Sequence, residues 1–126
     1  GIYATSDFVG MSGGTDLTVT TGTDTTVTGY TYGIRAINGG SGATTIIANG
    51  NVGVTGTDSK GIAAENAATA TDLNITTAAG TSINGNNVGI EAGNSGSGTT
   101  TITANGNVTG STGIAAVADV GAGDMT

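Results

Sequence analysis

The tetrapeptide Gly-Ile-x-Ala occurs five times along this chain. Its copies begin at Gly1, Gly33, Gly61, Gly89 and Gly113, so the successive spacings are 32, 28, 28 and 24 residues. A repeat of this period is typical of solenoid proteins, in which a unit buries its apolar side only by stacking on its neighbours. The chain is therefore expected to fold as a stack of similar units rather than around one globular core.

Two further phrases recur between the tetrapeptides. One reads DLTVTTG at 16–22 and returns at 44–50, 72–80 and 100–106, and the other reads TTVTG at 25–29 and returns at 51–56, 81–85 and 107–110. All three phrases alternate apolar and polar residues, which is the period of a half-buried strand. Gly, Asn and Ser between them supply turns. The unit is therefore three short strands and three turns in about 28 residues.

Parallel pairing of like strands predicts ladders of identical residues inside the stack. The best matches lie 56 residues apart, which indicates duplication of a two-unit block. The x positions of Gly-Ile-x-Ala vary and are expected to face solvent. The expected inner ladders are Ile2, Ile34, Ile62, Ile90 and Ile114, then Ala4, Ala36, Ala64, Ala92 and Ala116, and a third of Leu17, Ile46, Leu73 and Ile102, while the x positions are Tyr3, Arg35, Ala63, Glu91 and Ala115.

These patterns predict an all-β protein, a parallel β-helix (β-solenoid) with about four full rungs, a partial fifth and three short strands per rung. The expected single domain covers 1–126, with rungs at approximately 1–32, 33–60, 61–88, 89–112 and 113–126. Its apolar 36% is mostly Ala, Ile and Val, which suits a narrow lumen. An antiparallel β-sandwich is the alternative fold. Disorder is the other alternative, and the absence of Pro and the 9% charged residues argue against it.

Charge and composition exclude several classes of function. The net charge is −7, with Arg35 and Lys60 the only basic side chains, which argues against nucleic acid and anionic membrane surfaces. No apolar run approaches the ~20 residues that span a bilayer, so no direct membrane insertion of this segment is expected. His and Cys are absent, which removes thiol, zinc and most acid–base sites. No signal peptide is visible in 1–10, and the chain reads as a segment of a longer protein.

The acidic residues are scattered, so we expect no enzyme, no catalytic residue, no cofactor and no metal site. A glycosidase needs two carboxylates close together. Asp16 and Asp72 occupy equivalent positions, but two rungs would separate them by ~9–10 Å. They are expected to start strands at turns. A polysaccharide-active enzyme fragment stays an alternative, because acids from distant positions can come together in the fold.

Two surface features have binding potential. Tyr30, Tyr32 and Arg35 form the aromatic–cationic cluster of the sequence, and exposed aromatic rings can stack on sugars or anchor a partner. The plainer interpretation is a turn with partly buried rings.

Thr-x-Thr pairs at 18–20, 26–28 and 101–103 are the second feature. They suggest an ice-binding or self-assembling filament, although the equivalent positions at 45–47 and 74–76 interrupt the array. Thr is also a common strand residue.

The Gly-Ile-x-Ala phrases, the Gly/Asn/Ser turns and the pattern Thr-x-Ile-x-Ala-x-Gly-x-Val-x-Gly at 100–110 resemble passenger domains of bacterial autotransporters (type V secretion), in particular the Gly/Thr/Asn-rich, adhesin-like passengers. The resemblance covers the whole chain. It implies a right-handed β-helix outside the outer membrane, secreted through a C-terminal barrel that lies beyond this sequence.

The resemblance further implies a structural or adhesive stalk at the bacterial cell surface or in the extracellular space. Expected partners are a host-cell or matrix glycan or protein, or other copies joined end to end. No functional residue of the family has a counterpart here.

Overall fold

Three parallel sheets form the walls of the molecule. The structure is a computed structural model that describes residues 1–6, 16–119 and 123–126. Sheet A contains β1 (Ile2–Ser6), β4 (Tyr32–Asn38), β7 (Lys60–Asn66), β10 (Val88–Asn94) and β13 (Thr112–Ala118). Sheet B contains β2 (Leu17–Thr21), β5 (Thr44–Ala48), β8 (Leu73–Thr77) and β11 (Thr100–Ala104). Sheet C contains β3 (Thr26–Gly29), β6 (Asn51–Val54), β9 (Ser82–Asn84) and β12 (Asn107–Thr109).

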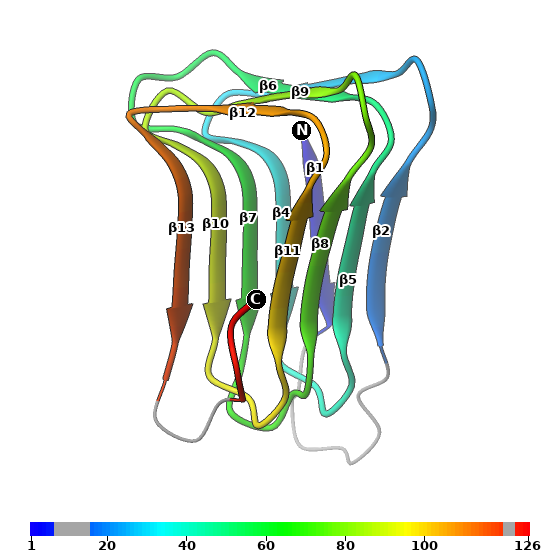
Figure 1. The fold of residues 1–126 in the computed structure, drawn as a ribbon, viewed down its shortest axis with the longest axis vertical. Helices are drawn as coiled ribbons and strands as arrows, with labels where there is room; N and C mark the ends of the chain where they lie inside the picture. Colours follow the sequence, from blue (N-terminus) through cyan, green and yellow to red (C-terminus); the bar gives the residue numbers. More distant parts are fainter. Residues whose placement is uncertain (7–15, 120–122) are drawn as a thin grey trace.

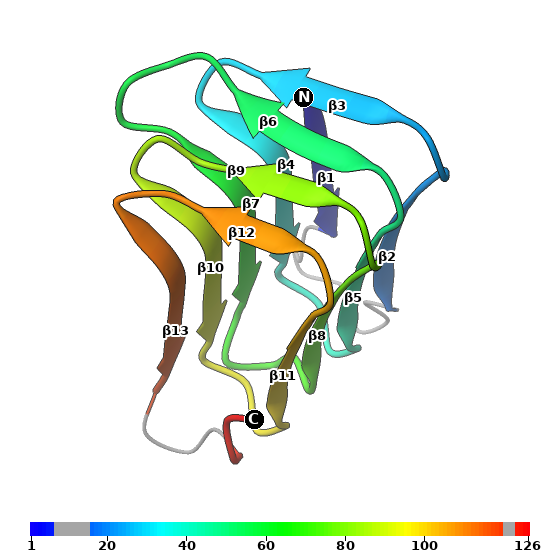
Figure 2. The same ribbon diagram turned by 45° about the horizontal axis from the view of Figure 1, so that its top comes forward.

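The chain visits the sheets in the order A, B, C and then returns to A one strand further along. In Figure 1 it runs down sheet A, up sheet B and across the top in sheet C. Figure 2 brings sheet C forward as the third wall. The predicted β-solenoid of about four turns with three strands per rung is thereby confirmed, and β13 adds a fifth strand to sheet A.

The isoleucine and alanine ladders of sheet A form in the predicted register. Ile34 pairs with Ile62, which pairs with Ile90, and the alanines two residues later follow the same register. The isoleucines of these three middle rungs are completely buried. In the last strand of sheet A, Ile114 is 44% exposed, because no described strand pairs with the outer edge of β13.

The third predicted ladder is wrong, because its members belong to two ladders of sheet B. Leu17 pairs with Thr44, which pairs with Leu73. Ile46 lies two residues further on, between Val19 and Ile75. Alternate rungs place Leu and Thr at the same inward position. Thr44 can be fully buried there because its hydroxyl donates to Asn66 Oδ1 at 2.6 Å.

An internal asparagine ladder stands at the corner between sheets A and B, and sequence reasoning missed it. Asn38, Asn66 and Asn94 are in register and at most 4% exposed. Asn94 accepts a bond from Gly96 N at 3.0 Å, and its Nδ2 donates to the carbonyl of Gly98. The ladder therefore satisfies backbone groups of the turns from inside, where water is excluded.

The ladder ends before the last rung, where Ala118 pairs with Asn94. Thr100 occupies the same inward position as Thr44, two rungs further along. Its Oγ1 is buried without a hydrogen-bond partner, because Ala118 stands where Asn66 accepts the bond from Thr44.

Ala118→Asn should therefore stabilise the chain by about 0.5–1.5 kcal/mol, the usual net value of one hydrogen bond. Urea unfolding monitored by circular dichroism measures this difference. The same substitution in a Thr100→Val background should gain nothing, because the donor is then absent. An equal gain in both backgrounds would contradict the explanation of the buried hydroxyl.

Ile62→Ala should cost about 2–5 kcal/mol in the free energy of unfolding, because Ile62 is completely buried between two rungs. Ile114→Ala is the matched control at the same ladder position, and its exposure should limit the loss to about 1.5 kcal/mol. Urea unfolding of both variants gives the comparison. Equal losses would mean that the end rung is covered in solution.

Candidate functional site

The outer face of sheet A carries both basic side chains of the chain and two of its three tyrosines. Tyr3 on β1 is opposite Arg35 on β4, and Tyr32 on β4 is opposite Lys60 on β7. Strand alternation turns Arg35 outward, because Ile34 and Ala36 on either side of it belong to the core. We call the set Tyr3, Tyr32, Arg35, Lys60, Glu65 and Glu91 the sheet A patch.

Arg35 lies against both aromatic rings of the patch. Its Cζ is 4.6 Å from the centroid of the Tyr32 ring and 5.8 Å from that of Tyr3. The ammonium of Lys60 is 6.0 Å from the Tyr32 ring. These distances are in the range of cation–π contacts. The rings, the guanidinium and the ammonium of Lys60 therefore form one continuous contact surface over the three neighbouring strands β1, β4 and β7.

Two ion pairs cross the strands of the patch. Arg35 is 3.5 Å from a carboxylate oxygen of Glu65, and Lys60 pairs with Glu91. All four side chains remain at least a quarter exposed, so each pair contributes little to stability. Since two cations meet two carboxylates, the patch is locally neutral in a chain whose net charge is −7.

Ala63 lies in the centre of this arrangement and corrects one expectation. It is an x position of Gly-Ile-x-Ala and is in register with Arg35 and Glu91. The x positions were expected to face solvent, yet Ala63 is only 1% exposed. We attribute its burial to the long side chains of Arg35 and Glu91, its register partners on the two neighbouring strands.

Of the predicted cluster, the structure brings Tyr32 and Arg35 together and leaves Tyr30 apart. Tyr30 is 75% exposed in the turn between β3 and β4, and no cation–π contact in the described part of the chain involves it. The prediction of a partly buried ring is therefore confirmed for Tyr32 and wrong for Tyr30. Tyr3, not Tyr30, is the second ring of the cluster. The sequence contains a signal for this contact, because Tyr3 and Arg35 are both x positions of the repeat.

The aspartates that precede strands of sheet B connect neighbouring rungs by hydrogen bonds. Asp16 accepts a hydrogen bond from Ala43 N at 2.9 Å, and Asp72 accepts one from Thr99 N at 2.8 Å. Each stands directly before a strand of sheet B, as expected. Within 1–6, 16–119 and 123–126, no three His, Cys, Asp or Glu side chains are grouped so that they could hold a metal ion.

The outward threonines of sheet B form two columns with interruptions. Thr18 and Thr45 are followed by Asn74 and Thr101, and in the neighbouring column Ile47 stands between Thr20 and Thr76. The interruptions predicted from the sequence are therefore at the expected places.

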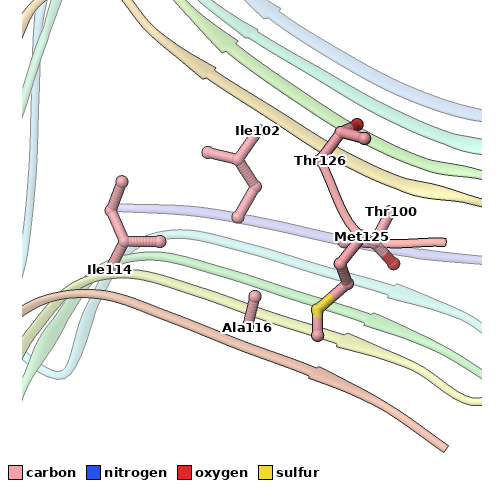
Figure 3. Close-up of a pocket in the computed structure, with 6 residues that line it drawn as sticks. All are labelled: Thr100, Ile102, Ile114, Ala116, Met125 and Thr126. Carbon is pink, nitrogen blue, oxygen red and sulfur yellow. The ribbon is translucent and has the colours of Figure 1, made fainter.

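Three hollows lie away from the patch. Two polar ones, of about 350 and 390 Å³, follow the corner between sheets B and C and share Gly80 and Thr81. The third, of about 290 Å³, is the open C-terminal end of the lumen, where Ile102, Ile114 and Ala116 surround an apolar space beside Met125 (Figure 3).

Comparison of the chain with known protein families, curated proteins and solved structures found no match. The described residues contain no helix with the length and hydrophobicity needed to cross a membrane.

Arg35→Met should lower the free energy of unfolding by about 1 kcal/mol or less, since it removes a half-exposed ion pair and its ring contacts but keeps an aliphatic stem. Arg35→Ala should cost more, because the stem over Ala63 is lost as well. Urea unfolding at low and high salt separates the two effects, since salt screens only the charge. Equal losses in both variants would show that the stem does not contribute.

Proposed function

We propose that this segment is part of a structural and adhesive β-solenoid stalk, displayed on a bacterial surface or secreted, which spaces binding regions and contributes a contact surface of its own. The fold supports the spacing role. Each rung adds ~4.8 Å along one axis, so the number of rungs determines the length. Every rung contacts only its neighbours, so rungs can be added without redesign of a core.

The observation that carries the proposal is the repetition of one rung geometry beneath variable outer positions. The inner positions of sheet A stay Ile and Ala in every rung, while the x positions are Tyr, Arg, Ala, Glu and Ala in chain order. A constant interior with a variable exterior suits a scaffold whose surface carries the specificity. The extracellular location is supported by the resemblance to autotransporter passengers.

The sheet A patch supports the adhesive role. It is locally neutral, and Tyr3 is 63% exposed beside Arg35. Exposed aromatic rings next to guanidinium and carboxylate groups can stack on and hydrogen-bond to sugars or anchor a protein partner. We therefore assign host-cell or matrix glycans and proteins as the partner class.

Duplication of residues 33–88, inserted after Val88, tests the spacing role. The insertion adds two rungs in the same alternation, so the dimension along the stacking axis should grow by ~10 Å in the shape obtained from small-angle scattering. The strand content per residue should stay constant in circular dichroism. An insertion that unfolds the chain or leaves its length unchanged would contradict the role as an extensible spacer.

The adhesive role is tested by binding of the purified chain to arrays of glycans and matrix proteins. Tyr3→Ala should weaken binding by about tenfold, because Tyr3 is the exposed ring of the patch. Tyr30→Ala is the matched control, since Tyr30 is even more exposed than Tyr3 but lies outside the patch. Absence of binding, equal effects of both variants, or turnover of a polysaccharide would each overturn this part of the proposal.

A further inference from the structure

The corner between sheets B and C alternates between long and short turns. Residues 22–25 connect β2 to β3, and residues 78–81 connect β8 to β9. In the rung between them, only Asn49 and Gly50 connect β5 to β6. Two long turns therefore stand on either side of a short one. The space between them lies inside the stack, between the first and the third rung.

This space is the polar hollow of about 350 Å³ described above. Its walls are residues 23–25 on one side and 78–81 on the other, with 49–51 between them. Gly50 packs so closely on the first long turn that a Cβ atom at this position would lie 2.4 Å from Thr25 O. The floor of the hollow is therefore fixed by contact between backbones.

Hydrogen bonds within the long turns hold the walls. Thr25 Oγ1 donates to Gly22 O, and Thr81 Oγ1 donates to Ala78 O, both at 2.7 Å. The two turns thus carry the same bond at the same positions. Because the hollow is formed before any ligand arrives, binding there does not require the turns to be ordered first.

Four polar groups of the residues that line the hollow have no hydrogen-bond partner within the described part of the chain. The Thr23 hydroxyl and Asn51 Nδ2 can donate, and the Asp24 carboxylate and Asn49 Oδ1 can accept. The other end of each amide is bound. Asn49 Nδ2 donates to Thr21 O at 3.0 Å, and Asn51 Oδ1 accepts a backbone amide of the third rung at 2.8 Å. Both amides are therefore held in place with one polar atom free for a ligand.

The lining favours an uncharged ligand that is rich in hydroxyl groups. Asp24 is the one charged side chain among the described residues that line the hollow, so no cation is available there for phosphate, sulfate or carboxylate groups. No grouping of His, Cys, Asp or Glu in the described ranges could hold a metal ion. No lining residue is apolar and larger than alanine, so an apolar anchor of a peptide finds no seat. Sugar hydroxyls both donate and accept, as the four free groups require.

We propose that this hollow binds one uncharged sugar ring of a glycan, at a site separate from the sheet A patch. The site deepens the adhesive role proposed above and rests on it for the source of the sugar, a host-cell or matrix glycan. The volume is at the lower end of the range for small-molecule sites, which suits a single ring. No aromatic residue lines the hollow, so hydrogen bonds alone hold the sugar and the affinity is low, with a Kd of about 1 mM.

The neighbouring polar hollow supplies an internal control. It measures about 390 Å³ and lies on the other side of the second long turn, beside residues 105–107. In this turn Ala79 occupies the position of Thr23, and Gly80 occupies that of Asp24. One donor and one acceptor are therefore missing, so the neighbouring hollow should bind the same sugar much more weakly.

The test variant combines Thr23→Ala with Asp24→Gly, which gives the first long turn the residues of the second. The fold accepts these residues at this corner, because Gly80 has a φ of 79° where Asp24 has a φ of 56°. Nuclear magnetic resonance follows the amide signals of the isotope-labelled chain during titration. The probes are cellotetraose, maltotetraose and tetra-N-acetylchitotetraose, with tetragalacturonate as the acidic control.

At least one uncharged probe should shift the amide signals of Asn49, Gly50 and Gly80 and leave those of 105–107 in place. The double variant should weaken this binding at least about fivefold, because two hydrogen-bonding groups are lost, and Tyr3→Ala should not change it. No shift with any uncharged probe, equal shifts at 105–107, tighter binding of tetragalacturonate, or unchanged binding by the double variant would each overturn the site.

The same variants separate this site from the sheet A patch. Binding that Tyr3→Ala weakens and the double variant does not would overturn the corner site and leave the adhesive role of the patch intact. Shifts at the corner that only the double variant weakens, together with no effect of Tyr3→Ala on any array, would support the corner site and overturn the patch.

Discussion

The pairing of each strand with its counterpart one rung away is the constraint on which the rest of this structure depends. None of the described strands pairs with the next strand along the chain, and the three sheets are built from strands that recur once per turn. A rung alone would expose its isoleucines, and a rung between two others buries them completely. Stability therefore depends on contacts between successive rungs along one axis. The end rungs have one neighbour instead of two and are the least stable.

The register of a sheet could be predicted from the sequence where the same residue types recur at the same positions of every rung. The Gly-Ile-x-Ala phrase set the register of sheet A, because Ile and Ala at fixed separation stack only on themselves. It failed in sheet B, where Leu17 was aligned with Ile46 although Thr44 is its partner. A threonine reads as an outward residue in an alternating pattern, and only the structure reveals that its hydroxyl is bonded inside by Asn66.

The asparagine ladder and the true members of the binding cluster were missed for the same reason, because both depend on contacts that only the folded chain brings together. Asn38 and its counterparts looked like turn residues, although their burial depends on backbone groups that only the folded corner brings within reach. Tyr30 and Tyr32 are close in sequence, but Tyr30 lies in the turn that follows β3 whereas Tyr32 is the first residue of β4. Tyr3 and Arg35 are 32 residues apart and touch, since proximity on this surface follows the rung period rather than the chain.

The placement of the aromatic residues has a consequence for how unfolding of the chain can be observed. All four aromatic side chains fall within the first 32 positions, and there is no tryptophan. Tyrosine fluorescence and near-ultraviolet dichroism therefore report on one end of the stack, whereas far-ultraviolet dichroism reports on every rung. A stack that frays from its ends would give two transition curves that do not coincide. The chain thus contains, without any label, an optical probe of the order in which its rungs come apart.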